Sequence, residues 1–237
     1  MVAVIVVALV ALIIGLRHPM PEVVAGADAD ALAHELVKAV DGEAWERTGA
    51  VRWRLPGRAH LWDRQHGLAR VEWRDQRVLF DINRKTGRAW RGGSEVTDGD
   101  ERQKLVDKAY ALWVNDSFWL NPVVKAFDDG TTRARGTVDK KRALLVSYTS
   151  GGLTPGDKYL WIVGDDGRPA AWRLWVGIIK LVPGLQFTWE GWTRLATGAW
   201  VATSHKALGI DVVPIRDLAA AATLGELDPS DPFAPLR

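Results

Sequence analysis

Asn115, Asp116 and Ser117 stand side by side in "LWVNDSFWL" and are the residues whose types could carry acid–base chemistry. A catalytic carboxylate needs a histidine or a second acid within hydrogen-bond reach. The sequence places no histidine predictably near this triplet. The alternative is the end of a helix, where Asn and Ser terminate the last turn and Asp is solvated. We therefore expect a helix end here and no catalytic group.

Nucleophilic and metal chemistry have equally little support. Ser204 and His205 are adjacent, so on a strand they point to opposite faces and cannot form a dyad. No G-x-S-x-G elbow, H-E-x-x-H pair, calcium loop, G-x-G-x-x-G or Walker loop is present. We expect no catalytic residues, no metal site and no cofactor. The five histidines are His18, His34, His60, His66 and His205.

Composition excludes further classes of protein. The 237 residues include no cysteine, so disulfides, thiol nucleophiles and cysteine-type zinc sites are absent. The formal net charge is only +2 and the arginines are scattered along predicted strands. A field of that size does not hold nucleic acid, so we expect no nucleic-acid partner.

Tryptophan is the residue that most distinguishes the chain, with 13 copies. Each large ring buries about 150–250 Å², which suits either the lining of an apolar ligand cavity or a tryptophan-rich core. Lys125 follows a Trp-Leu-Asn-Pro run and could meet an anionic head group at the rim of such a cavity. The candidate lining residues are Trp53, Trp73, Trp113, Trp119, Trp161, Trp172 and Trp189.

Two amphipathic helices are predicted to position these residues. The first covers residues 28–40, with Asp28 or Asp30 as its N-terminal cap. The second covers residues 99–116. Asp98 and Glu101 there have the spacing of a capping box, and Pro122 prevents any continuation.

Period-two alternation predicts most of the remaining chain as antiparallel strands. Residues 45–90 read as a meander of about five strands separated by turn sequences. Strands resume after Gly130, and residues 185–195 form a further alternating run. About ten or eleven strands and two helices indicate an α+β domain over 28–218. We expect a single large curled antiparallel sheet covered by the helices. Residues 219–237 are expected to form a flexible tail.

Residues 2–16 are unbroken apolar sequence, "VAVIVVALVALIIGL". As a helix they span about 22 Å, which suits a signal-peptide core or a short membrane anchor. Residues 1–27 are therefore predicted as a signal or anchor segment with a linker. Cleavage near "AGA" at 25–27 and retention as an anchor both stay open, as does the orientation. We expect export to the periplasm or cell envelope, with tethering to the membrane.

The stretch "SFWLNPVVKAFDDGTT" is similar to a segment in an uncharacterised bacterial envelope branch of the LolA/LolB-like lipoprotein-carrier superfamily. The order of anchor, helix, meander, inserted helix and further strands resembles that fold over roughly residues 28–215. "YLWIVGDDGRPAAWRLW" resembles the hairpin that follows in that group. The resemblance implies an open half-barrel around a hydrophobic cavity. The matching positions are Phe118, Trp119, Leu120, Pro122, Lys125 and Gly130.

Two functional hypotheses follow. The first is a non-enzymatic envelope protein that binds a lipid or lipid-like apolar ligand in the half-barrel cavity. The second is a structural or protein-interaction module of the envelope, with the same fold, a filled core and no ligand. They differ in one structural quantity, the space left between the tryptophans. The oligomeric state is not encoded in any pattern of this sequence.

Overall fold

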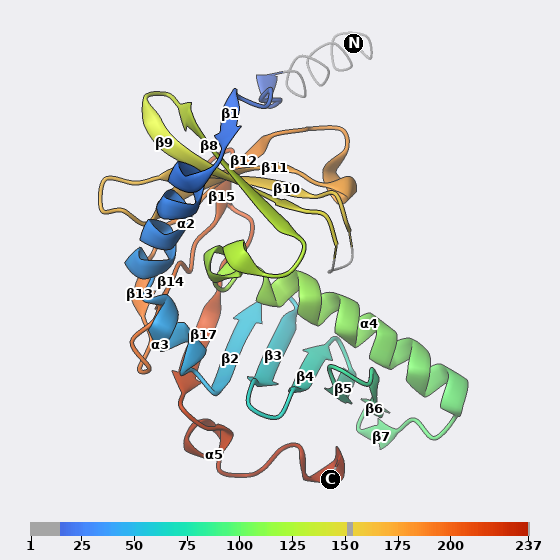
Figure 1. Cartoon of the computed structure of the whole chain (residues 1–237). Helices are drawn as coiled ribbons and strands as arrows, with labels where there is room; N and C mark the ends of the chain where they lie inside the picture. Colours follow the sequence, from blue (N-terminus) through green and yellow to red (C-terminus); the bar gives the residue numbers. More distant parts are fainter. Residues whose placement is uncertain (1–14, 151–153, 237) are drawn as a thin grey trace, which may run out of the picture. The chain divides into compact units, whose positions relative to one another are not determined.

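The computed structural model describes residues 15–150 and 154–236 (Figure 1). The predicted membrane segment at 2–16 lies outside this range except for its last two residues. Within the range, no helix combines the length and apolarity needed to cross a membrane. The chain divides into two compact units. Among the described residues, unit 1 comprises 15–40, 123–150, 154–190 and 205–212, and unit 2 comprises 41–122, 191–204 and 213–236.

Unit 1 is built on a six-stranded antiparallel sheet with the order β1-β8-β9-β10-β11-β12. Its strand β10 lies inside the sheet and buries the four consecutive residues Leu160, Trp161, Ile162 and Val163, so both of its faces are covered. A two-stranded ladder and two short 3-10 helices complete the unit. The strands are β1 (Val23–Ala25), β8 (Thr131–Val138), β9 (Lys141–Tyr148), β10 (Lys158–Val163), β11 (Pro169–Trp175), β12 (Leu185–Thr188), β15 (Lys206–Ala207) and β16 (Ile210–Asp211), and the 3-10 helices are η1 (Pro122–Phe127), whose first residue belongs to unit 2, and η2 (Gly177–Ile179).

Helix α2 (Ala27–Ala39) packs against β8 and β9 of this sheet and buries Leu32 and Leu36. Neither predicted aspartate caps it, because the N-cap is Gly26 and makes no side-chain hydrogen bond. Asp28 and Asp30 lie instead in the first turn, where negative charge is favourable. Their carboxylates pair with Arg135 Nη2 at 2.7 Å and Arg133 Nε at 2.5 Å on β8. These two ion pairs therefore connect α2 to the sheet.

Unit 2 contains a seven-stranded antiparallel sheet with the order β17-β2-β3-β4-β5-β6-β7. Strands β2–β6 are the predicted five-strand meander, which is confirmed. The elements are β2 (Ala50–Leu55), β3 (Arg58–Asp63), β4 (Leu68–Trp73), β5 (Gln76–Asp81), β6 (Thr86–Arg91), β7 (Ser94–Glu95), β13 (Thr193–Arg194), β14 (Trp200–Val201), β17 (Arg216–Ala221), α3 (Gly42–Glu46), α4 (Gly99–Ser117), α5 (Leu224–Leu227) and η3 (Ala234–Leu236).

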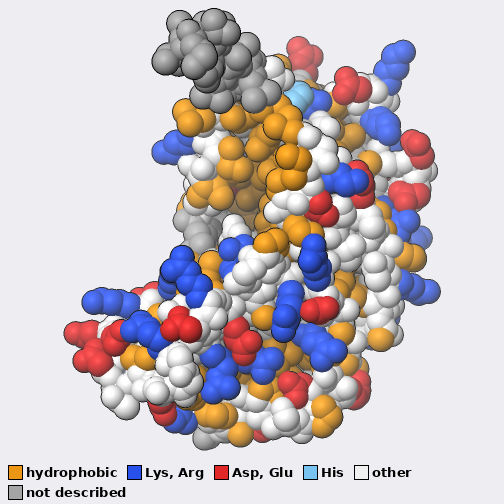
Figure 2. Space-filling model, turned by 180° about the vertical axis from the view of Figure 1, so that it is seen from behind, with side chains coloured by type: hydrophobic (Ala, Val, Ile, Leu, Met, Phe, Trp, Pro, Cys, Tyr) orange, Lys and Arg blue, Asp and Glu red, His pale blue; other side chains and the backbone are white. Residues whose placement is uncertain are grey.

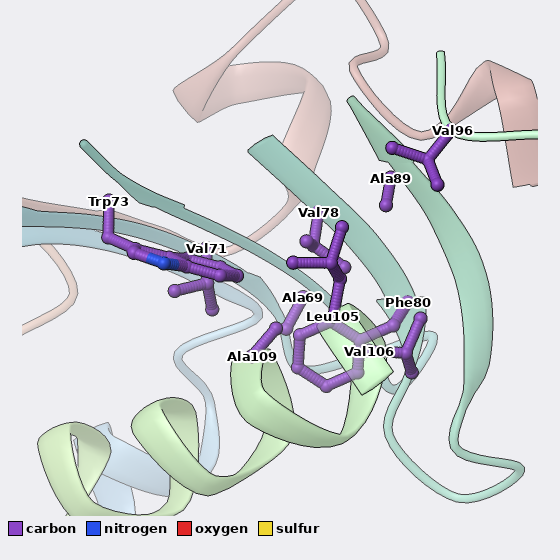
Figure 3. Close-up of a cluster of buried hydrophobic side chains, with 10 residues drawn as sticks. All are labelled: Ala69, Val71, Trp73, Val78, Phe80, Ala89, Val96, Leu105, Val106 and Ala109. Atoms are coloured by element: carbon purple, nitrogen blue, oxygen red, sulfur yellow. The ribbon is translucent and has the colours of Figure 1, made fainter. Parts of the chain in front are cut away.

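Helix α4 covers one face of this sheet. Leu105, Val106 and Ala109 lie against strand residues such as Val71 and Phe80, and together they form a dry core (Figure 3). The helix begins as predicted, with the Asp98 carboxylate accepting a hydrogen bond from the Glu101 amide at 2.8 Å. The Glu101 carboxylate does not close a capping box. It accepts from Arg91 Nη1 at 2.5 Å.

The opposite face of the seven-stranded sheet is covered by the C-terminal residues, which corrects the expectation of a flexible tail. Strand β17 pairs with β2 through Ala221, and the chain beyond it continues into α5 and η3. Phe233 is 0% exposed and packs with Leu61, Leu79 and Leu224. The Pro- and Asp-rich composition gave no sign of this packing, which depends on Leu224, Leu227, Phe233 and Leu236.

The expectation of one large curled sheet is also corrected, because the described residues form two large open sheets, of six and seven strands, together with the two-stranded ladders β13-β14 and β15-β16. Neither large sheet closes into a barrel in the described part of the chain. The alternating run at 185–195 was predicted as one strand, but β12 ends at Thr188. Gly191 follows with a φ of +64°, a left-handed conformation that an extended strand does not contain. The α+β, mainly antiparallel class holds, with one long helix on each sheet.

Candidate functional site

A network of four residues in unit 2 is centred on the buried side chain of Asp116. The Asp116 side chain is fully buried, and its Oδ2 accepts hydrogen bonds from Arg58 Nε at 2.6 Å and His60 Nε2 at 2.9 Å. Its Oδ1 accepts from Asn115 Nδ2 at 2.9 Å. The expectation that Asp116 is solvated and lacks a nearby histidine is therefore wrong.

Helical and strand periodicity place these groups together. Asp116 follows Ala109 by seven residues, so the two lie on the same face of α4, the face that packs on the sheet. Arg58 and His60 are two residues apart on β3 and share the face that meets this helix. Trp53 is the register partner of His60 on β2, and the two rings stack with centroids 4.6 Å apart.

The second ring nitrogen of His60 gives the network its unusual feature. The Nε2–H group donates to the carboxylate, which leaves Nδ1 as the second polar atom of the ring. This Nδ1 is buried and has no hydrogen-bond partner among the described residues, and the same is true of Trp53 Nε1. Burying such an atom costs about 1–3 kcal/mol, so the pair is held by the surrounding packing and by the Arg58–Asp116 bond.

An aspartate that orients a histidine is also one half of the arrangement used in nucleophilic catalysis. The other half requires a nucleophile beside the free nitrogen and room for a substrate. Here the ring face is covered by Trp53, and the His60 and Asp116 side chains are both 0% exposed. The arrangement can clamp the end of α4 to β3, and nothing described places a reacting atom against it.

Three of the seven candidate tryptophans come together in unit 1. Trp161 and Trp172 are register partners on β10 and β11, with ring centroids 4.7 Å apart. Trp189 packs edge-on against both, at 5.0 Å from each. All three are at most 3% exposed. Tyr159 and His205 extend the cluster, at 5.1 Å from Trp172 and 4.3 Å from Trp189 respectively.

The other four candidate tryptophans lie in unit 2 and have separate surroundings. Trp53 stacks on His60, as described above. Trp73 belongs to the core beneath α4. Trp113, half-buried, meets Trp62 edge-on at 5.1 Å. Trp119 is half-buried just after the helix, and its amide donates to the Asp116 carbonyl at 3.3 Å.

Lys125, the candidate rim charge, lies on η1 and is half-exposed. Its ammonium group pairs with the Asp128 carboxylate three residues later. The cation is therefore already engaged within its own loop.

Asp157 is the centre of a separate polar cluster in unit 1, where its carboxylate accepts three hydrogen bonds. Its Oδ2 accepts from Thr154 Oγ1 at 2.5 Å and Tyr159 Oη at 3.3 Å, and its Oδ1 accepts from the Gly177 amide at 2.8 Å. The last bond fixes the start of the loop that follows β11. Burial raises the pKa of Tyr148 and of Tyr159, and for Tyr159 the adjacent Asp157 carboxylate raises it further.

Alkaline pH is expected to destabilise unit 1 through these two phenols. Up to about pH 10, folded and unfolded chains both keep the protons and stability is unaffected. Above that pH the unfolded chain releases them first, because the folded pKa is raised, so stability falls with rising pH. Urea denaturation at several pH values between about 9 and 11 measures the fall. The Tyr148→Phe/Tyr159→Phe variant should flatten it, and an equally steep fall in that variant would contradict the assignment.

Among the described residues, no group of three or more His, Asp or Glu side chains is placed to hold a metal ion. No protein-family model matches the sequence, and no curated protein matches it significantly. What can be said of function therefore comes from the geometry of the chain.

Proposed function

We propose that the protein is a non-enzymatic module of the cell envelope that acts through its surface, as a structural or protein-interaction element, and holds no ligand in its interior. The observation that carries this proposal is the contact of Trp161, Trp172 and Trp189 with one another. Rings whose centroids lie 4.7–5.0 Å apart are in direct contact. An acyl chain has no room between them.

The core of unit 2 supports the same proposal. Trp73 and Phe80 lie among buried aliphatic residues of the sheet and α4, at most 9% exposed (Figure 3). Interiors packed to this degree contain few voids larger than a water molecule. The half-barrel carrier stays the competing hypothesis, and it requires space that these side chains occupy.

The buried network around Asp116 supports a non-enzymatic role. A general base must come within about 3 Å of the proton that it removes. His60 is enclosed by Trp53 and the helix, so a substrate would have to displace part of the core to reach it. The network is better suited to fixing α4 on the sheet.

Native mass spectrometry of the protein purified from its own envelope tests the proposal. We expect the mass of the polypeptide alone and no saturable binding of a fluorescent fatty acid. Trp189→Ala is the positive control, since an apolar space of that kind binds small apolar molecules. The variant should therefore bind free indole, whereas the parent protein should not. One lipid per chain in the native protein would overturn the proposal and favour the carrier.

A further inference from the structure

We propose that one rim of unit 1 rests on the lipid surface of a membrane. We define this lipid rim as residues 16–18, the loop 177–184 between β11 and β12, and the hairpin 206–212. The inference goes beyond the proposed function, because it assigns a partner to a specific surface.

Exposed large apolar side chains concentrate in the lipid rim. Ile178 and Leu181 in the loop are each 72% exposed, and Leu208 and Ile210 at the hairpin are 62% and 67% exposed. Hydrophobic side chains gather into a patch on the face of the molecule seen in Figure 2. A contiguous exposed apolar patch marks an interaction site for protein, ligand or membrane.

The end of the apolar N-terminal run is hydrogen-bonded directly to this loop. Arg17 Nε donates to the Leu181 carbonyl at 3.0 Å, and the His18 amide donates to the Pro183 carbonyl at 3.1 Å. His18 Nδ1 lies 3.0 Å from the Gly184 carbonyl. The loop itself is fixed at its start by the Gly177–Asp157 bond.

The hairpin also lies beside Leu16 and His18, and together they surround a shallow hollow of about 270 Å³. Leu16, His18, Leu185 and Leu208 contribute to its wall, together with Lys206. The hairpin is held to β12 by a hydrogen bond from the Lys206 amide to Thr188 Oγ1 at 3.1 Å. Three chain segments that are distant in sequence therefore share one rim.

Residues 17–27 were expected to form a linker, but Arg17 and His18 are hydrogen-bonded to the loop, and this close connection points to a lipid bilayer as the partner. Residues 2–16 are the predicted membrane segment, and one Cα step of about 3.8 Å separates Leu16 from Arg17, which is bonded to the loop. If residues 2–16 enter the membrane, the loop that Arg17 contacts through the Leu181 carbonyl is held close to the membrane surface. Arg17 and Lys180 add cations beside the apolar residues, the combination found at membrane interfaces.

The lack of cysteine in the chain allows a direct test with single labels. Ile178→Cys and Leu208→Cys each carry an environment-sensitive fluorophore in the full chain, reconstituted with vesicles of phosphatidylcholine and phosphatidylglycerol. Asp165→Cys is the matched control. It lies in unit 1 in the turn before β11, about 20 Å along that strand from the loop. Lipids with quenchers on their acyl chains report contact with the bilayer.

We expect quenching at positions 178 and 208 to be several-fold stronger than at 165. An Ile210→Asp/Leu181→Asp background should bring the quenching at 178 and 208 down toward that of the control, while residues 2–16 are unchanged. Equal, weak quenching at all three positions, or a full chain that does not associate with the vesicles, would overturn the inference. The result is independent of whether the purified protein carries an internal lipid, so the two proposals can fail separately.

Discussion

Replacing Asp116 with alanine is expected to lower the free energy of unfolding of unit 2 by about 3–5 kcal/mol, the usual effect of removing one partner from a buried ion pair. The variant leaves the Arg58 guanidinium beside a space and His60 Nε2 without its acceptor. His60 would then have two unpartnered ring nitrogens in the core, since Nδ1 has no partner among the described residues.

Native-state hydrogen exchange of the β3 amides measures this loss, because it reports on unit 2 by itself. Asp107→Ala is the matched control. It removes the same side chain from the same helix at an exposed position, where the expected change is within about 0.5 kcal/mol. If the two variants exchange at the same rate, the network does not hold α4 on the sheet.

The sequence contains one signal for this network. Asp116 continues the stripe formed by Val106 and Ala109 on α4, and an acid on a buried stripe needs a partner. The helix could be predicted from its own period and its Asp98 cap. The partners could not, because Arg58 and His60 lie more than fifty residues earlier. Only the packing of α4 on the sheet, which places its C-terminal end beside β3, brings them within 2.9 Å.

The contrast between local patterns and contacts distant in sequence also explains why the meander could be predicted and the division into two large sheets could not. Each hairpin of the meander joins neighbours in sequence, so alternation and turns were sufficient to predict β2–β6. The order of strands in a sheet depends on long-range pairing. β17 joins β2 across more than 160 residues, and β1 joins β8 across about 110. Nothing local in Arg216–Ala221 distinguishes an edge strand from a tail.

Phe233→Ala is expected to destabilise unit 2 by about 3–5 kcal/mol, as truncation of a fully buried phenylalanine does elsewhere. The ring lies against Leu61, Leu68 and Leu79 on the face of the sheet opposite α4. Removing the ring leaves a cavity under the C-terminal segment. That segment has few other apolar contacts with the sheet that could offset the lost stability. Urea denaturation of the full chain gives the change in free energy.

Pro235→Ala is the comparison that makes this result interpretable, since Pro235 is two residues away with an exposed side chain. Its backbone carbonyl still accepts from Arg88 Nη1 at 3.3 Å, so the substitution keeps the polar contact and alters little burial. If Phe233→Ala behaves like Pro235→Ala, residues 219–237 are the loose tail that their composition predicts. If Phe233→Ala alone is destabilised, and proteases cut the chain after Ala221 more rapidly, the C-terminal segment is an integral layer of unit 2. The sheet of unit 2 is then covered on both faces, by α4 on one and by this segment on the other.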